Sequence, residues 1–266
     1  MRHGRLVLLS ISVLLFGCAL TMREASLPVE HTVEREQLIV YSNFAVPRYH
    51  RLLDELVALR ADLSARLQLP QSDEPIHIYL FDNSDPYEAY MQQVFPSVPS
   101  RRAVFVETDT RLAVYGFWGD YIAVDLRHEV SHGYLHAVVP NLPLWLDEGL
   151  AEYFEVARGA RGLNTAHVEL LRSDYDEWRP DLERLEALSD IGDMRLRDYA
   201  ESWLWVHFYL ESNERRLDLL RNYLARLRML GTAPPFSQYV LESDPAAVYD
   251  LREWLSEESL NTEHTE

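Results

Sequence analysis

Two histidines spaced four residues apart carry the clearest chemical signal in the chain. Residues 127–133 read R-H-E-V-S-H-G and contain the pattern H-E-x-x-H. On a helix, His128 and His132 lie on one face and can bind a single Zn²⁺ ion. Glu129 lies about 100° further around the helix, where its carboxylate can reach a water bound to the metal. The pattern therefore predicts a zinc ion with a general base beside it.

A catalytic zinc site needs a third protein ligand, with one position left open for water. Pro140 and Pro143 interrupt the first helix, and a second helical pattern begins near Leu144. Glu148 lies in the first turns of that second helix, where an antiparallel return of the chain would bring it back to the histidines. Glu152 follows one turn later on the same face, where it can accept a hydrogen bond from a ligand imidazole and fix its tautomer.

Two rival ligand sets are excluded by spacing. His136 continues the i, i+4 series, but it lies about 12 Å along the helix axis from His128, which is too far to share an ion. The metzincin pattern H-E-x-x-H-x-x-G-x-x-H requires glycine and histidine where this chain has Leu135 and Val138.

These motifs resemble those of the gluzincins, the thermolysin-like and aminopeptidase-like zinc metallopeptidases. Residues 145–153 read W-L-D-E-G-L-A-E-Y, which is similar to the W-L-x-E-G-x-A-x-Y pattern that follows H-E-x-x-H. The resemblance covers about residues 127–157 and implies Glu148 as the third zinc ligand and Glu152 as the acidic residue that orients a ligand. The G-x-M-E-N segment of gluzincin aminopeptidases is absent, so aminopeptidase activity is not implied. The chain looks most like bacterial members of unassigned substrate.

The resemblance also implies a hydrogen-bond donor for the oxyanion that forms during hydrolysis. In gluzincin aminopeptidases, this donor is a tyrosine just ahead of an apolar helix, downstream of the E-G motif. Tyr199 resembles that place loosely. The alternative is that Tyr199 only packs at the start of a helix, in which case His207 is the next candidate.

The composition and the order of predicted elements indicate the fold class. Of the 266 residues, 47% are hydrophobic, which suffices for a packed core, and the formal net charge of −18 disfavours a nucleic-acid partner. Strands come first, then the two motif helices, then helices alone, which predicts an α+β fold. The resemblance implies the zincin shape, a small mixed β-sheet with helices, the H-E-x-x-H helix and a helical C-terminal part. We expect residues 37–255 to form one domain and residues 256–266 to be a disordered tail.

A hairpin and an aromatic turn precede the first motif. Residues 103–106 and 112–115 flank T-D-T, which is typical of a β-hairpin. By resemblance, one of these strands could pair with an extended substrate. Phe117 and Trp118 follow in the turn G-F-W-G, where they could line the cleft or pack in the core.

The amino terminus is typical of a targeting segment. Basic residues precede an apolar run over residues 6–16, which is too short to span a bilayer but suits a secretory signal. The run leads into L-F-G-C, which resembles the bacterial lipobox and implies acylation of Cys18, the only cysteine. Simple secretion is the alternative. We therefore expect a signal peptide over residues 1–17, a tether over residues 18–36 and a lipid-anchored protein of the bacterial cell envelope, facing the periplasm or exterior.

The sequence supports two functions of different classes. The first is a zinc-dependent peptidase that hydrolyses a peptide or protein substrate, with Glu129 as the general base. The second is a membrane-anchored binding or assembly protein that keeps a structural zinc site. A structural site would be closed by four protein ligands, and the sequence offers no convincing fourth, which favours the peptidase. The sequence does not distinguish an endopeptidase from an exopeptidase, and it does not indicate the oligomeric state.

Overall fold

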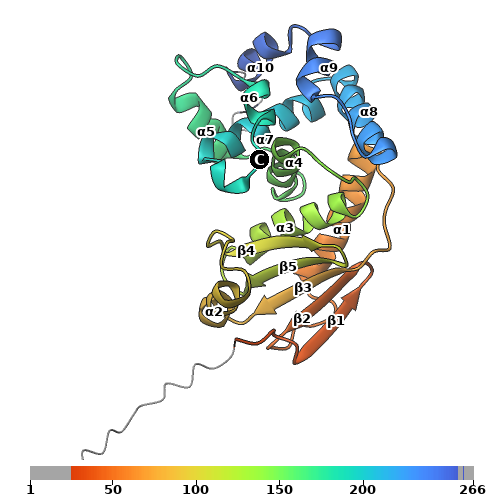
Figure 1. Cartoon of the computed structure of the whole chain (residues 1–266), viewed down its shortest axis with the longest axis vertical. Coiled ribbons are helices and arrows are strands. Elements are labelled where there is room, and N and C mark those ends of the chain that lie inside the picture. The colour runs from red at the N-terminus through yellow and green to blue at the C-terminus, as the bar shows by residue number, and fades with distance from the viewer. Residues whose placement is uncertain (1–24, 257–259, 261–266) are drawn as a thin grey trace, which may run out of the picture.

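The computed structural model describes residues 25–256 and Leu260 as an N-terminal sheet with helices and a C-terminal helical part (Figure 1). This confirms the α+β class. The strands are β1 (His31–Arg35), β2 (Leu38–Ser42), β3 (Ile76–Phe81), β4 (Ala103–Thr108) and β5 (Arg111–Phe117). The helices are α1 (Arg51–Leu67), α2 (Ser84–Val94), α3 (Ile122–His136), α4 (Leu144–Phe154), α5 (Thr165–Ser173), α6 (Leu182–Glu186), the 3-10 turn η1 (Ile191–Asp193), α7 (Leu196–Glu211), α8 (Glu214–Leu230), α9 (Phe236–Ser243) and α10 (Ala247–Ser256).

The five strands form one mixed sheet in the order β1-β2-β3-β5-β4. The inner pairs β2–β3 and β3–β5 are parallel, whereas β1–β2 and the hairpin β4–β5 are antiparallel. The hairpin expected over residues 103–115 is thereby confirmed. Its first strand, β4, is an edge strand and lies beside α3 (Figure 1). The backbone of β4 therefore has one side that is not paired with another strand.

Helices cover the sheet on both faces. The face formed by Ile76, Ile78 and Val114 belongs to the main core, which α1 and α3 complete with their apolar stripes. The opposite face packs its aromatic side chains against α2 in a smaller cluster. Gly133 lets α3 approach the sheet closely, because a Cβ atom there would lie 2.9 Å from Cδ1 of Ile76.

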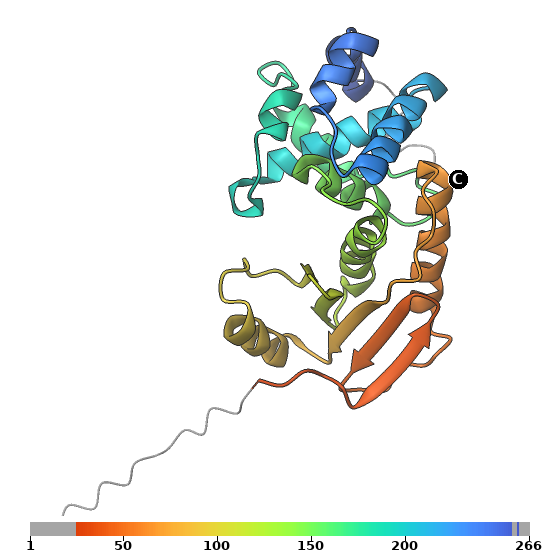
Figure 2. The same ribbon diagram turned by 45° about the vertical axis from the view of Figure 1, so that its right-hand side comes forward.

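The C-terminal helices stack on the motif helices, with α4 between α3 and α7 (Figure 2). Gly149 allows α4 to meet α7 almost backbone to backbone, because a Cβ atom there would lie 2.5 Å from the carbonyl oxygen of Ser202. Helix α1 runs from the sheet to the helical part, where Arg66 forms an ion pair of 2.7 Å with Glu211. The two parts therefore share a continuous core.

Two segments differ from the sequence expectations. Residues 31–35 fall within the expected tether but form β1, an edge strand whose side chains are mostly exposed. Such a strand carries little apolar pattern, because pairing with β2, the partly buried Val33 and an ion pair of Arg35 with Asp54 hold it. Within the expected tail, Leu260 is buried. No helix in the described ranges has the length and apolar character needed to cross a membrane.

Candidate metal centre

The two motif helices bring His128, His132 and Glu148 together in a buried group that could hold a metal ion. Helix α3 presents both imidazoles on the face that packs against α4, as their spacing predicts. Helix α4 begins directly after Pro143 and places Glu148 in its second turn. The Nε2 atoms of the two histidines are 3.3 Å apart. Oε2 of Glu148 lies 3.5 Å from Nε2 of His128 and 4.0 Å from Nε2 of His132.

The donor atoms of this group fit a tetrahedral ion. A Zn²⁺ ion about 2.0–2.1 Å from each ligand keeps neighbouring ligand atoms roughly 3.3 Å apart. The three observed separations, 3.3, 3.5 and 4.0 Å, are close to that value. Oε2 of Glu148 is also buried without a hydrogen-bond partner. Because an unpartnered buried carboxylate oxygen is costly, the group is incomplete without a cation.

Each imidazole is oriented by a carboxylate from α4 or its end. Nδ1 of His128 lies 2.9 Å from Oε2 of Glu155, and Nδ1 of His132 lies 2.9 Å from Oδ1 of Asp147. An ionised carboxylate only accepts hydrogen bonds, so each Nδ1 donates and each Nε2 keeps its lone pair for the centre. In its neutral form, each histidine is therefore held in the tautomer that metal binding requires.

Glu152, the residue expected to orient an imidazole of the centre, makes different contacts. Its Oε2 atom lies 2.8 Å from Nε2 of His167 and accepts a longer bond of 3.3 Å from Asn164. The imidazole of His128 is held instead by Glu155, the residue that caps α4. The spacing of seven residues between Glu148 and Glu155, two helical turns, is the signal that could have indicated this.

The charges around the centre favour a bound cation. Burial by itself lowers the pKa of His128, but Glu148 and Glu155 raise it well above the ordinary value. Burial also lowers the pKa of His132, but the negative charge of Asp147 outweighs burial, so the pKa of His132 is raised as well. A proton and a metal ion therefore compete for the same Nε2 lone pairs.

A hydrogen-bonded chain leads from His132 towards the surface. Asp147 bonds Nδ1 of His132 through Oδ1 and Nε2 of His136 through Oδ2, each at 2.9 Å. Nδ1 of His136 then lies 2.6 Å from Oε2 of the exposed Glu107. Burial lowers the pKa of His136, but Asp147 and Glu107 together raise it to about 9. His136 therefore helps to fix Asp147 and is not a third imidazole of the centre.

Two further acid–histidine groups adjoin the centre, but their atoms already bond each other. Only the group with Glu148 contains a buried oxygen that lacks a partner among the described residues. We therefore place the candidate ion at that group. The two adjoining groups are His132 with His136 and Asp147, and His128 with Glu152 and Glu155.

A cleft of about 650 Å³ opens beside the centre. His128 and Glu129 lie in its wall, and Phe117 from the aromatic turn lines it as well. Oε2 of the buried Glu129 accepts a hydrogen bond of 2.6 Å from the backbone N–H of Phe105. That N–H belongs to the edge strand β4, so the strand fixes the carboxylate at the border of the cleft.

The two candidates for the oxyanion donor lie in different environments. Tyr199 is half-buried in the first turn of α7, and its hydroxyl oxygen accepts a hydrogen bond of 2.5 Å from Arg101. Burial raises the pKa of Tyr199, and the charge of Glu148 raises it further, while its hydrogen-bond partner Arg101 lines the cleft. His207 is only 4% exposed and accepts a hydrogen bond of 3.2 Å from Trp254, so it belongs to the aromatic core.

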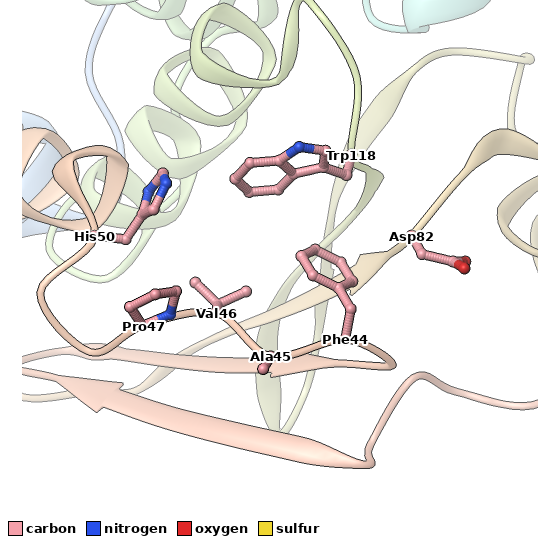
Figure 3. Close-up of a pocket in the computed structure, with 7 residues that line it drawn as sticks. All are labelled: Phe44, Ala45, Val46, Pro47, His50, Asp82 and Trp118. Atoms are coloured by element: carbon pink, nitrogen blue, oxygen red, sulfur yellow. The ribbon is translucent and has the colours of Figure 1, made fainter.

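Trp118, the second aromatic of the turn, faces a different hollow. Figure 3 shows its indole opposite Phe44 and His50, whose rings it meets edge-on at centroid distances of 5.4 and 5.5 Å. The hollow has a volume of about 350 Å³ and shares no lining residue with the cleft at the centre. Of the two aromatic residues in the turn, Phe117 therefore lines the cleft at the centre, whereas Trp118 packs against Phe44 and His50 outside that cleft.

Neither a scan against protein-family models nor a search of curated proteins gives a match to this chain. Cys18 lies outside the described residues. The geometry itself provides a buried His-His-Glu group that could hold a metal ion, and a cleft beside it.

Proposed function

We propose that this protein is a zinc-dependent peptidase. The observation that carries the proposal is the convergence of two Nε2 atoms on a buried, unpartnered Oε2 atom of Glu148. A ligand set of two imidazoles and one carboxylate is typical of catalytic zinc. His128, His132 and Glu148 would hold the ion, which supplies a Lewis acid that polarises the scissile carbonyl and acidifies a water.

Glu129 is our candidate for the general base. Its Oε2 atom is fixed by the N–H of Phe105. Its second oxygen is then available to take a proton from the attacking water and to pass it to the leaving amine. Glu129 is not needed as a ligand, because the three atoms of the centre come from other side chains. Its placement in the cleft wall supports a chemical duty.

The edge strand β4 is our candidate for substrate positioning. Among the described strands it pairs with β5 alone, and Ala103, at its start, lines the cleft. An extended peptide can add to such an edge through main-chain hydrogen bonds, which would hold its backbone beside the centre. This arrangement agrees with the role that the gluzincin resemblance implies for one strand of the hairpin.

Tyr199 is our candidate for the oxyanion donor. Because its oxygen accepts a hydrogen bond from Arg101, its own O–H proton remains free to donate to another group. The hydrogen bond to Arg101, which lines the cleft beside the centre, supports a position of Tyr199 next to the cleft. A donor placed in this way stabilises negative charge on the carbonyl oxygen.

The lipid anchor remains a proposal of its own. Acylation of Cys18 would hold the enzyme at the membrane of the bacterial cell envelope. Cys18→Ser should abolish incorporation of a labelled fatty acid in vivo. Label retained on this variant would refute the anchor without affecting the peptidase.

The peptidase proposal is tested by Glu129→Gln, which keeps the volume of the side chain but cannot take up a proton. We expect wild-type protein to bind one zinc ion and to cleave a mixed peptide library, and a chelator to stop cleavage. The variant should bind zinc and melt close to wild type but lose about 10²–10⁴-fold in turnover, the usual worth of a positioned general base.

Other outcomes have clear meanings. A wild-type protein that binds zinc but cleaves nothing would support the alternative, a binding protein with a structural zinc site. A variant that cleaves at the wild-type rate would mean that Glu129 is not the base. Stoichiometric zinc retained by a His128→Ala, His132→Ala double variant would place the ion elsewhere.

A further inference from the structure

We infer that Arg101 binds a carboxylate of the substrate, so that the enzyme prefers peptides with a free carboxylate close to the scissile bond. This inference rests on the proposed function, because it concerns the same cleft. It adds a substrate class to a reaction that the metal centre alone leaves unspecified.

Arg101 lies in the cleft together with the candidate catalytic groups. It lies two residues before the start of β4 and lines the same hollow as His128 and Glu129. Burial disfavours its charged form, but Tyr199 and the carboxylates of Glu148 and Glu129 raise its pKa. Arg101 therefore stays positively charged within electrostatic reach of the centre.

No carboxylate in the described part of the chain forms an ion pair with the guanidinium of Arg101. Its hydrogen bond goes to the neutral phenol of Tyr199, over whose ring it lies at 5.6 Å. The neighbouring Arg102 differs, because its Nε and Nη2 atoms donate hydrogen bonds of 2.9 and 2.7 Å to the carboxylate of Asp125. A guanidinium carries five N–H donors in a planar fork, so Arg101 keeps donors for a planar anion.

The distribution of charge in the cleft favours Arg101 as the group that binds a carboxylate of the substrate. The chain carries a net charge of −18, and Glu129, Glu152 and Glu155 line the cleft. A divalent ion at the centre would offset the charge of Glu148, so that less negative charge competes for Arg101. Among the side chains that line the cleft, Arg101 offers a guanidinium that forms no ion pair with a carboxylate of the described residues, and a guanidinium suits bidentate binding of a carboxylate.

A small hollow beside Arg101 indicates what carries the carboxylate. It has a volume of about 160 Å³ and is bordered by Arg101 and by apolar side chains that include Met91, Phe95 and Val98. An apolar side chain fits this hollow while a carboxylate on the same residue meets the guanidinium. A C-terminal apolar residue offers both groups, whereas an internal glutamate offers only the carboxylate.

The experiment uses two matched pairs of peptides. One pair differs only in a free or amidated C-terminus after an apolar residue, and the other is amidated and differs only in an internal Glu or Gln. Binding is measured by calorimetry on the full mature chain, zinc-loaded and carrying Glu129→Gln, so that peptides are not consumed. Values of kcat/KM are measured in parallel on the active protein.

We expect at least one acid form to bind about 10-fold or more tightly than its amide, since a charged hydrogen-bonded pair is replaced by a neutral one. The pair that shows the preference identifies the source of the carboxylate. Adding Arg101→Gln should remove the preference, and Arg101→Lys should retain part of it, because lysine keeps the charge but not the fork. The matched control Arg102→Gln removes a cation that Asp125 already neutralises, and it should keep the preference.

Three results would overturn the inference, two in binding and one in cleavage. Equal binding of acid and amide forms in both pairs would show that no carboxylate is recognised. Equal losses for all four peptides in Arg101→Gln would show that Arg101 acts only by holding Tyr199. If the wild type cleaves nothing but the acid preference in binding persists, the carboxylate site stands and the peptidase proposal fails. If the wild type cleaves all four peptides without any preference, the peptidase proposal stands and the carboxylate site is refuted.

Discussion

The contact between α4 and α7 makes Gly149→Ala a sensitive probe of the centre. An added Cβ atom would lie 2.5 Å from the carbonyl oxygen of Ser202 and 2.8 Å from Cγ2 of Val206. Real Cβ atoms essentially never come closer than 3.0 Å to such neighbours. The backbone oxygen cannot rotate away, so α4 must move from α7. Because Glu148 directly precedes Gly149, the movement also displaces a proposed zinc ligand.

Two opposing contributions decide the size of the effect. Alanine in place of glycine within a helix favours folding by about 1 kcal/mol. Overpacking a filled core costs about 1–3 kcal/mol, and we take the upper end because the obstructing atom belongs to the backbone. We therefore expect Gly149→Ala to lower the free energy of unfolding by about 2 kcal/mol and to weaken zinc binding as well.

The measurement is urea unfolding in the presence of a chelator, followed by zinc titration against a chromogenic competitor. Gly133→Ala is the matched control, since the three atoms nearest to its Cβ atom, the first at 2.9 Å, all belong to the side chain of Ile76 and none to the backbone. That contact can relax, so the helix preference of alanine should largely offset its cost. The reasoning is refuted if Gly149→Ala is as stable as wild type, or if Gly133→Ala is the more damaging change.

Two further predictions concern the ligand supports and a core histidine. Asp147→Asn and Glu155→Gln should each weaken zinc binding by about 10–100-fold in competition titrations, because each removes the acceptor that orients an imidazole. Glu152→Gln should change it less, and an equal loss would mean that Glu155 is not the orienting residue. Burial lowers the pKa of His207 from 6.5 to about 4. The unfolded chain therefore binds the extra proton, and about 2 kcal/mol of stability should be lost as the pH falls from 7.5 to 5. His207→Gln in chelator should unfold with a correspondingly smaller dependence on pH, and an unchanged slope would assign the acid sensitivity to other groups.

Sequence patterns were sufficient for the parts of the site that depend on local geometry. Helical periodicity alone puts His128 and His132 on one face, and prolines mark where the first helix ends and α4 begins. The order of strand-like and helical patterns likewise indicated the α+β class. These predictions could be made because each depends on residues within a few turns of one another.

The contacts that the side chains of the site make with one another depend on long-range packing. Glu152 and Glu155 are both acidic and close together at the end of α4. Only the packing of α3 and α5 against α4 determines that Glu155 contacts His128 and that Glu152 contacts His167. The link from Phe105 to Glu129 joins a strand to a helix across 24 residues, and no local pattern encodes it.

The same limit applies to Arg101 and to β1. Arg101 and Arg102 are adjacent, identical in type and both line the cleft, yet only Arg102 pairs with Asp125, whereas Arg101 bonds Tyr199. Strand β1 is held by pairing with β2 and by contacts of Val33 and Arg35 with other elements, none of which is local in sequence. Periodicity in the sequence indicates which face of a helix or strand is buried. The residues that contact that face depend on long-range packing, because all helices and strands must bury their apolar faces in the same core.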